Sequence, residues 1–177
     1  YTATYVNGNI ATGTCAEWTG ISHSEINLDN LVDVVVGECC TVINGGAFEN
    51  CETLSSVTVG SNVYRIAFDA FNGCTSLTSC TILGNGLEEI QSGAFENCVS
   101  LISIDIPSSI KEIGISAFYD CTSLNSITVR ATLPPKNVNK YTFFNTNCQI
   151  YVPSGSVSSY KRAEGWSEYA ERIQAIQ

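Results

Sequence analysis

Residues 93–113 read GAFENCVSLISIDIPSSIKEI, and this stretch decides the fold because similar copies of it return along the chain. An Ala-Phe pair stands at residues 47–48, 70–71, 94–95 and 117–118, so successive copies lie 23, 24 and 23 residues apart. In every copy a Cys follows the Phe by three residues, and a Leu follows the Cys by three. Apolar positions that return in register at this period indicate a solenoid, in which each unit buries its apolar side against its neighbours.

Each unit combines two short apolar patterns. Leu101, Ile104 and Ile106 lie on one side of an alternating run, which predicts a short strand with one buried face. The apolar residues of Gly-Ala-Phe-x-x-Cys-x-x-Leu are three apart, which predicts a helical turn, and the Ala recurs because we expect no larger side chain to fit. The second spacing contains one extra residue, within residues 83–86, where we expect a loop to absorb the insertion without shifting the core.

Both ends of the chain depart from the repeat, as the uncovered end coils of a solenoid require. Residues 1–27 contain the turn dipeptide Asn7-Gly8 and a capping-box spacing at 22–25, which predict a hairpin and a short helical turn. In residues 154–177, three apolar residues at helical spacing are expected to cover the last coil: Trp166, Tyr169 and Ile173. The alternative is that Trp166 stacks on a sugar ring, but an uncovered last coil would expose apolar surface.

The charge of the chain restricts its partners. The net charge is −9, and residues 1–110 hold twelve acidic residues but one basic residue, Arg65. Such an acidic body repels phosphate backbones, so we expect no nucleic-acid partner. No apolar run approaches the ~20 residues needed to cross a bilayer, so no transmembrane segment is expected in this chain. Because the chain starts at Tyr1 without Met, we expect any signal or anchor segment to be absent from it.

The quoted repeat resembles that of the BspA-like leucine-rich-repeat surface proteins of anaerobic bacteria. The linker Ala131-Thr132-Leu133-Pro134-Pro135 and the tail motifs at 150–153 and 165–173 are also similar to that family. The resemblance covers residues 28–177. It implies an α/β fold: a right-handed leucine-rich-repeat solenoid of about six coils, with short parallel strands and helical turns, capped at both ends. We therefore expect an N-terminal cap at 1–27, the repeat array at 28–153 and a helical C-terminal cap at 154–177.

Nine cysteines raise the question of disulfides or a metal site. Six of them fall in apolar slots of the repeat and are expected to be buried thiols that pack as small hydrophobic side chains: Cys40, Cys51, Cys74, Cys80, Cys98 and Cys121. The chain has no Cys-x-x-Cys motif and one His, so no metal is expected. The resemblance to the family implies that a disulfide, if one forms, joins Cys15 to Cys39, and such a bond would stabilise the chain by about 3 kcal/mol.

The residues that carry catalysis in other proteins are sparse in this chain. His23 is the only histidine, and it stands in the expected capping segment. Glu88 and Glu89 are adjacent in a repeat turn, and the other copies carry Tyr64-Arg65 and Lys111-Glu112 there, which favours a solvated face over a glycosidase carboxylate pair. The resemblance brings no catalytic residues either, so we expect no enzyme and no cofactor.

The polar residues of the predicted strands form the candidate binding face. One column consists of Ser56, Ser79, Ser103 and Ser126, and the column beside it consists of Thr58, Thr81, Asp105 and Thr128. Small hydroxyl side chains suit a crowded sheet, and they also form the kind of flat, neutral surface that repeat proteins use for partners. We expect binding on this face rather than on the turn face, where Glu49, Asn72, Glu96 and Tyr119 share one slot.

The function expected from the resemblance is a cell-surface binding or adhesion module, located outside the cell. Its partner would be a protein or glycan on another cell or in the matrix, and the chain itself is expected to be a monomer. The scatter of Tyr64, Tyr119 and Tyr151 over different slots weakens the glycan alternative. The alternative function is a structural stalk or display element with no ligand of its own.

Overall fold

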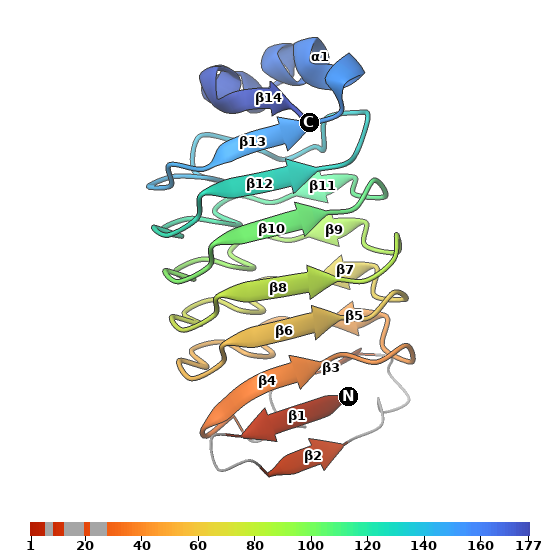
Figure 1. Cartoon of the computed structure of the whole chain (residues 1–177), viewed down its shortest axis with the longest axis vertical. Coiled ribbons are helices and arrows are strands. Elements are labelled where there is room, and N and C mark those ends of the chain that lie inside the picture. The colour runs from red at the N-terminus through yellow and green to blue at the C-terminus, as the bar shows by residue number, and fades with distance from the viewer. Residues whose placement is uncertain (6–8, 13–19, 22–27) are drawn as a thin grey trace.

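The chain folds as a stack of coils with one sheet along the front and a second, narrower sheet behind it (Figure 1). The computed structural model describes residues 1–5, 9–12, 20–21 and 28–177. Sheet A has nine strands, here in chain order: β1 (Thr2–Tyr5), β2 (Ile10–Thr12), β4 (Leu31–Val35), β6 (Ser56–Val59), β8 (Ser79–Ile82), β10 (Ser103–Ile106), β12 (Ser126–Val129), β13 (Gln149–Val152) and β14 (Ile173–Ala175). Sheet B has five: β3 (Gly20–Ile21), β5 (Val42–Ile43), β7 (Arg65–Ile66), β9 (Glu89–Ile90) and β11 (Glu112–Ile113).

The strands of sheet A pair one coil apart, as the sequence period predicts. β10 pairs in parallel with β12, with Ser103 opposite Ser126 and Ile104 opposite Ile127. Sheet B was not predicted, although its residues were recognised as apolar slots, because a strand of two residues is too short to show alternation. Both sheets consist of parallel pairs from β4 onward, so the repeat array is a solenoid of stacked coils, as predicted.

The Ala-Phe segment forms single turns with three-residue hydrogen bonds, and these do not continue into a regular helix. The Cys51 N–H donates to the Phe48 carbonyl at 3.1 Å, a bond that spans three residues. The Phe48 N–H, however, donates to the Ala70 carbonyl of the next coil at 2.8 Å. Because alternate N–H groups bond to the neighbouring coil, they are unavailable for a continuing helix. The Ala of each Ala-Phe pair is fully buried, as expected for a slot without room for more than a methyl group.

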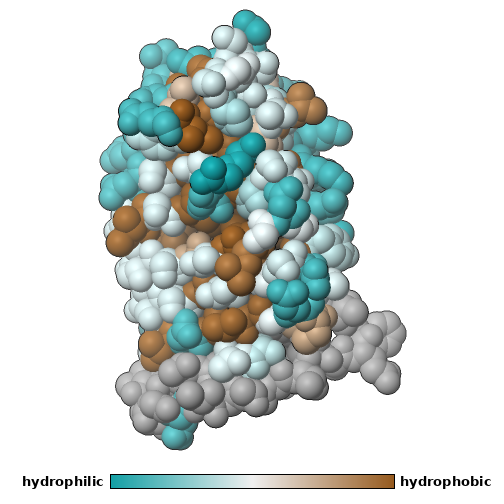
Figure 2. Space-filling view, turned by 45° about the vertical axis from the view of Figure 1, so that its right-hand side comes forward, coloured by the Kyte–Doolittle hydropathy of each residue, from teal (hydrophilic) through white to brown (hydrophobic). Residues whose placement is uncertain are grey.

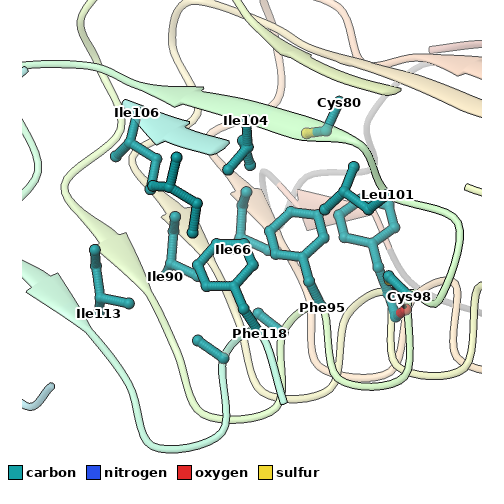
Figure 3. Packing of buried hydrophobic residues seen from close by; sticks show 14 of the residues in the cluster. Ile66, Cys80, Ile90, Phe95, Cys98, Leu101, Ile104, Ile106, Ile113 and Phe118 are labelled. Carbon is teal, nitrogen blue, oxygen red and sulfur yellow. Dashed lines mark hydrogen bonds between the residues drawn. The ribbon is translucent and has the colours of Figure 1, made fainter. Parts of the chain in front are cut away.

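A column of phenylalanine rings fills the core. Figure 3 shows Phe95 and Phe118 side by side beneath Ile104 and next to the isoleucines of sheet B. Successive rings from Phe48 to Phe143 stack with centroids 5.1, 5.1, 5.4 and 5.7 Å apart. Offset stacking of this kind contributes about 0.5–1.5 kcal/mol per pair beyond the burial of area. The repeat therefore stabilises the array mainly through contacts between coils.

The predicted cysteine ladder is confirmed. Its four members, Cys51, Cys74, Cys98 and Cys121, are buried and carry thiols. The Sγ of Cys98 donates to the Phe71 carbonyl at 3.2 Å, and the other members make the corresponding contact with the preceding coil. Burial raises the pKa of each of these thiols.

The prediction that a disulfide, if one forms, joins Cys15 to Cys39 is wrong. Cys39 is exposed and belongs to the cysteines that form no disulfide among the described residues, whereas its neighbour Cys40 is disulfide-bonded. Cys40 is fully buried, as its slot predicts, but it is not the thiol that we expected there. The other expected half of the bond, Cys15, lies outside the described residues. A buried slot thus predicts burial of a cysteine without deciding its oxidation state.

Elements outside the repeat lie at both ends of the array. β1 and β2 form the expected antiparallel hairpin, and β1 also pairs with β4 at the edge of sheet A. The expected turn at 22–25 lies outside the described residues. At the other end, η2 (Ser154–Ser156), α1 (Val157–Arg162) and η3 (Trp166–Arg172) precede β14, which pairs in parallel with β13. The return of the tail as a strand was not predicted, and it places Ile173 on sheet A.

Candidate functional site

The candidate binding face is the outward side of sheet A, and we call it the strand face. Alternate residues of β6, β8, β10 and β12 point outward, while the residues between them enter the core. The eight predicted residues all lie on this face. Four are exposed (Ser79, Thr81, Ser103 and Asp105), and four are half-buried (Ser56, Thr58, Ser126 and Thr128).

The serine column of the strand face is continuous. Ser56, Ser79, Ser103 and Ser126 lie opposite one another on successive coils. Asp33 extends the column on β4, where its carboxylate accepts a hydrogen bond from Ser56, and Gln149 extends it on β13. The column therefore crosses six coils with short polar side chains that donate and accept hydrogen bonds.

The second column is interrupted between β8 and β10. Thr58 lies opposite Thr81, and Asp105 lies opposite Thr128, but the pairing of β8 with β10 ends at Cys80 and Ile104. The extra residue at 83–86 leaves the apolar slots of the core in register, as expected, although the two strands separate on the sheet just before it. Ile82, the residue at this point, is half-buried, whereas Val59 and Ile106 in the same slot are fully buried.

Pro107 lacks one of the hydrogen bonds that would join the strands at this point. The Leu83 N–H donates to the Val59 carbonyl at 2.9 Å, and the Arg130 N–H donates to the Ile106 carbonyl at 3.0 Å. Pro107 holds the same position on the coil between them, and proline has no N–H to donate to Ile82. The backbone of residue 107 therefore makes no hydrogen bond to the Ile82 carbonyl, on the coil that follows the insertion at 83–86.

The separated strands form a groove of about 380 Å³ on the strand face. Ser79, Thr81 and Ser103 line it, and Asp105 and Arg130 stand at its side. The Arg130 guanidinium donates to both carboxylate oxygens of Asp105, at 2.7 and 2.5 Å, and this bond raises the pKa of Arg130. The groove therefore offers neutral hydroxyl groups beside an exposed ion pair, a combination suited to hydrogen-bonded recognition of a partner.

The two adjacent glutamates each form an ion pair with a neighbouring coil. Glu88 pairs with Lys111 at 2.7 Å, and Glu89 pairs with Arg65 at 2.6 Å, so each carboxylate binds a cation of a neighbouring coil. His23 lies outside the described residues. Within the described ranges, no three His, Cys, Asp or Glu side chains group closely enough to hold a metal ion.

The side of the molecule with the turns that follow the sheet A strands shows apolar atoms in separate patches between polar ones (Figure 2). Leu83 and Leu133 supply exposed apolar side chains on these turns. In this view the exposed apolar side chains of the described residues do not join into one strip along the coils.

An exposed aromatic cluster on the turn face was missed in the sequence. Tyr119 and Phe144 stack with centroids 5.1 Å apart, and Tyr141 lies 6.3 Å from Phe144. The signal was present, because the alignment of Phe143 with Phe118 places Phe144 in the slot of Tyr119. The comparison of Tyr64, Tyr119 and Tyr151 considered tyrosines alone and did not include Phe144.

Trp166 is a structural residue and does not bind a sugar. Its side chain is fully buried, and its indole N–H donates to the Pro135 carbonyl at 2.8 Å. Tyr169 lies edge-on to Phe143, and its hydroxyl donates to the Asn139 carbonyl at 2.7 Å. The cap therefore satisfies its polar atoms on the last coil that it covers.

Comparison with known proteins places the chain among bacterial repeat proteins. A family model described as the BspA type leucine rich repeat region matches residues 41–162 in six copies. Among solved structures, the chain is similar to the T. pallidum leucine rich repeat protein, with 27% identity and a TM-score of 0.55. It is also similar to a leucine rich cell surface protein from Faecalibacterium prausnitzii, with 26% identity and a TM-score of 0.52.

The chain spans only part of these relatives. The two matches cover 82% and 72% of this chain, but 62% and 34% of the other proteins. The pneumococcal vaccine antigen PcpA is matched over 98% of this chain and 46% of its own, with a TM-score of 0.62, but at 16% identity it supports the fold alone.

No curated protein matches the chain. Among the residues that the structure describes, no helix is both long and apolar enough to cross a bilayer. The six matched repeats and the stacked coils together show that the chain belongs to the family of BspA-type leucine-rich-repeat proteins.

Proposed function

We propose that this chain is a binding module that acts outside the cell and recognises a protein on another cell or in the extracellular matrix through its strand face. The observation that carries the proposal is the serine column, whose members lie in register on successive coils beside the groove at Asp105. Short side chains let a partner approach the sheet closely and lose little conformational entropy on binding.

Two further observations support a place outside the cell. The similar protein from F. prausnitzii is described as a cell surface protein. Cys40 is disulfide-bonded, and structural disulfides persist mainly in oxidising, extracellular compartments. These observations concern location, and they leave the identity of the partner to experiment.

The test is a double substitution on the strand face, Ser79→Arg with Ser103→Arg. Both serines are exposed, so the changes should leave the fold intact while two long cations block close approach. The matched control is Ser158→Arg with Ser159→Arg, which adds the same charge at exposed positions of α1. Binding is measured on immobilised matrix proteins and on whole cells.

We expect the strand-face variant to lose binding at least tenfold, the effect of about 1.4 kcal/mol, while the control binds like the parent. Because the serine column is neutral, binding of the parent should depend weakly on salt. Equal binding by the parent and the strand-face variant would contradict the proposal. Binding to glycans in place of proteins would overturn the choice of partner but keep the surface.

A further inference from the structure

The aromatic cluster on the turn face consists of Tyr119, Tyr141 and Phe144, and we call it the aromatic patch. Phe144 is 47% exposed and Tyr141 is 43% exposed, so much of their ring surface faces solvent. Tyr119 and Phe144 are nearly parallel, with 13° between their planes, and Tyr141 is tilted by 53° against Phe144. Two exposed aromatic rings in contact with each other and with a half-buried third ring form an apolar patch of the kind that marks a contact site.

Carboxylates lie next to the aromatic patch. Glu96 holds the slot of Tyr119 on the preceding coil, and Asp120 follows Tyr119 and accepts a hydrogen bond from Asn145 at 2.7 Å. Burial and the nearby charges of Asp69 and Asp120 raise the pKa of Glu96. The three ion pairs between described residues involve none of these acidic side chains.

Aromatic rings beside carboxylates form a surface that favours the binding of a cation. The face of an aromatic ring attracts an ammonium or guanidinium group within about 6 Å of its centroid. One ring of the aromatic patch already binds an ammonium group in this way, since the Lys140 Nζ lies 5.0 Å from the centroid of the Tyr141 ring. The carboxylates of the described residues are too dispersed to hold a metal ion, which leaves an extended cationic ligand.

We propose that the aromatic patch docks a basic peptide segment of a partner protein, whose Arg or Lys side chains stack on Tyr119 and Phe144 and reach Glu96 and Asp120. The net charge of −9 would steer such a segment toward the molecule, and the aromatic rings would decide where it settles. The surface lies on the turns and shares no residue with the strand face. This proposal can therefore be tested independently of the proposed function.

The probe is a synthetic peptide with several arginines separated by glycine and serine, and its reference is the same peptide with citrulline at every arginine. Citrulline keeps the shape of arginine and lacks the charge. Binding is followed by fluorescence anisotropy at low ionic strength, where exposed charges interact over a longer range. We expect the arginine peptide to bind, the citrulline peptide to bind at least tenfold more weakly, and added salt to abolish the difference.

Three double variants locate the site. Tyr119→Ser with Phe144→Ser removes two rings without changing the charge. Glu96→Gln with Asp120→Asn removes two carboxylates while keeping their shape. The matched control, Glu38→Gln with Glu52→Gln, removes two exposed carboxylates elsewhere. We expect each of the first two variants to weaken peptide binding about tenfold, and the control to change it less than about twofold.

The outcomes separate the site from general attraction to an acidic chain. The proposal is overturned if the Tyr119/Phe144 variant binds the peptide as well as the parent does. It is also overturned if the control and the Glu96/Asp120 variant lose binding equally, or if the parent does not bind the peptide. Preferential binding of a neutral oligosaccharide, lost in the Tyr119/Phe144 variant, would also overturn it in favour of a sugar site. The Ser79/Ser103 variant of the strand face should bind the peptide at least as well as the parent, so the two proposals fail separately.

Discussion

The Sγ of Cys98 donates a hydrogen bond to the carbonyl of Phe71, 3.2 Å away on the preceding coil. The same carbonyl accepts the backbone N–H of Cys74 at 3.1 Å, so the thiol binds the second lone pair of that oxygen. Cys74 and Cys121 repeat the contact with Phe48 and Phe95. A thiol that is both buried and bound to a carbonyl is stabilised in its protonated form, and this gives the fold a sensitivity to alkaline pH.

The first prediction is a loss of stability at high pH. Burial raises the pKa of the Cys80 and Cys121 thiols from 9.0 to about 12. Between these two pH values the unfolded chain has lost the protons that the folded chain retains, so the free energy of unfolding falls as pH rises. Each thiol contributes about 1.4 kcal/mol per pH unit within this window. The measurement is urea unfolding at about pH 8 and about pH 10.5.

Cys80→Val is the control for this prediction, because Val57 occupies the same slot one coil earlier. The variant should fold normally at pH 8 and lose less stability on alkalisation than the parent, by about 1.4 kcal/mol per pH unit. Equal losses in variant and parent would show that Cys80 does not contribute to the pH dependence.

The second prediction concerns the two adjacent cysteines. In the native, oxidised protein, a maleimide should label Cys39 rapidly, because it is exposed and outside the disulfide. Cys40 should react only after reduction and unfolding, since it is buried and disulfide-bonded. Peptide mapping of the labelled protein checks both points and identifies the partner of Cys40. A map that finds Cys40 alkylated and Cys39 in a disulfide would reverse the assignment.

The third prediction tests why β8 and β10 separate. Pro107→Ala supplies the N–H that Leu83 and Arg130 provide on the neighbouring coils. We expect the new amide to bond to the Ile82 carbonyl and to exchange slowly with solvent, with the groove narrowed. The effect on stability should be small, because a gain of about 1 kcal/mol from the bond opposes the loss of proline rigidity. Fast exchange at position 107 would show that the insertion alone keeps the strands apart.

The fourth prediction concerns the C-terminal cap. Trp166 is fully buried, packs against Phe143 and Tyr160, and donates to the Pro135 carbonyl. Trp166→Ala should lower the free energy of unfolding by about 3–5 kcal/mol, because it leaves a cavity at the open end of the phenylalanine column. Truncation after Pro153 should be more severe, since it also removes β14 from sheet A. A melting temperature unchanged by either alteration would show that the tail does not stabilise the array.

The sequence predicted the parts of the fold that depend on the repeat. Phe95, Cys98, Leu101 and Ile104 occupy slots that recur in every full copy, and all four are buried as expected. Features that break the period were missed. β14 is a three-residue strand after an irregular tail, and β8 separates from β10 beside an insertion and a proline that lacks an N–H.

The candidate site was predictable to a similar extent. The outward position of Ser79 and Ser103 follows from alternation along the strand, and the structure places them as expected. The aromatic patch was not predicted, because Tyr141 and Phe144 belong to the last repeat, where the spacing lengthens. The oxidation state of Cys40 had no sequence signal, since burial suits a thiol and a disulfide equally.

The claim that a partner binds the strand face is tested most directly by photo-crosslinking from that face. A p-benzoylphenylalanine in place of Ser126 lies at the edge of the serine column, where it can touch a bound partner without filling the groove. The same residue in place of Ser158 on α1 is the control. After irradiation on matrix proteins or whole cells, we predict a covalent adduct from position 126 and none from position 158. An adduct from position 158 together with none from position 126 would contradict the account.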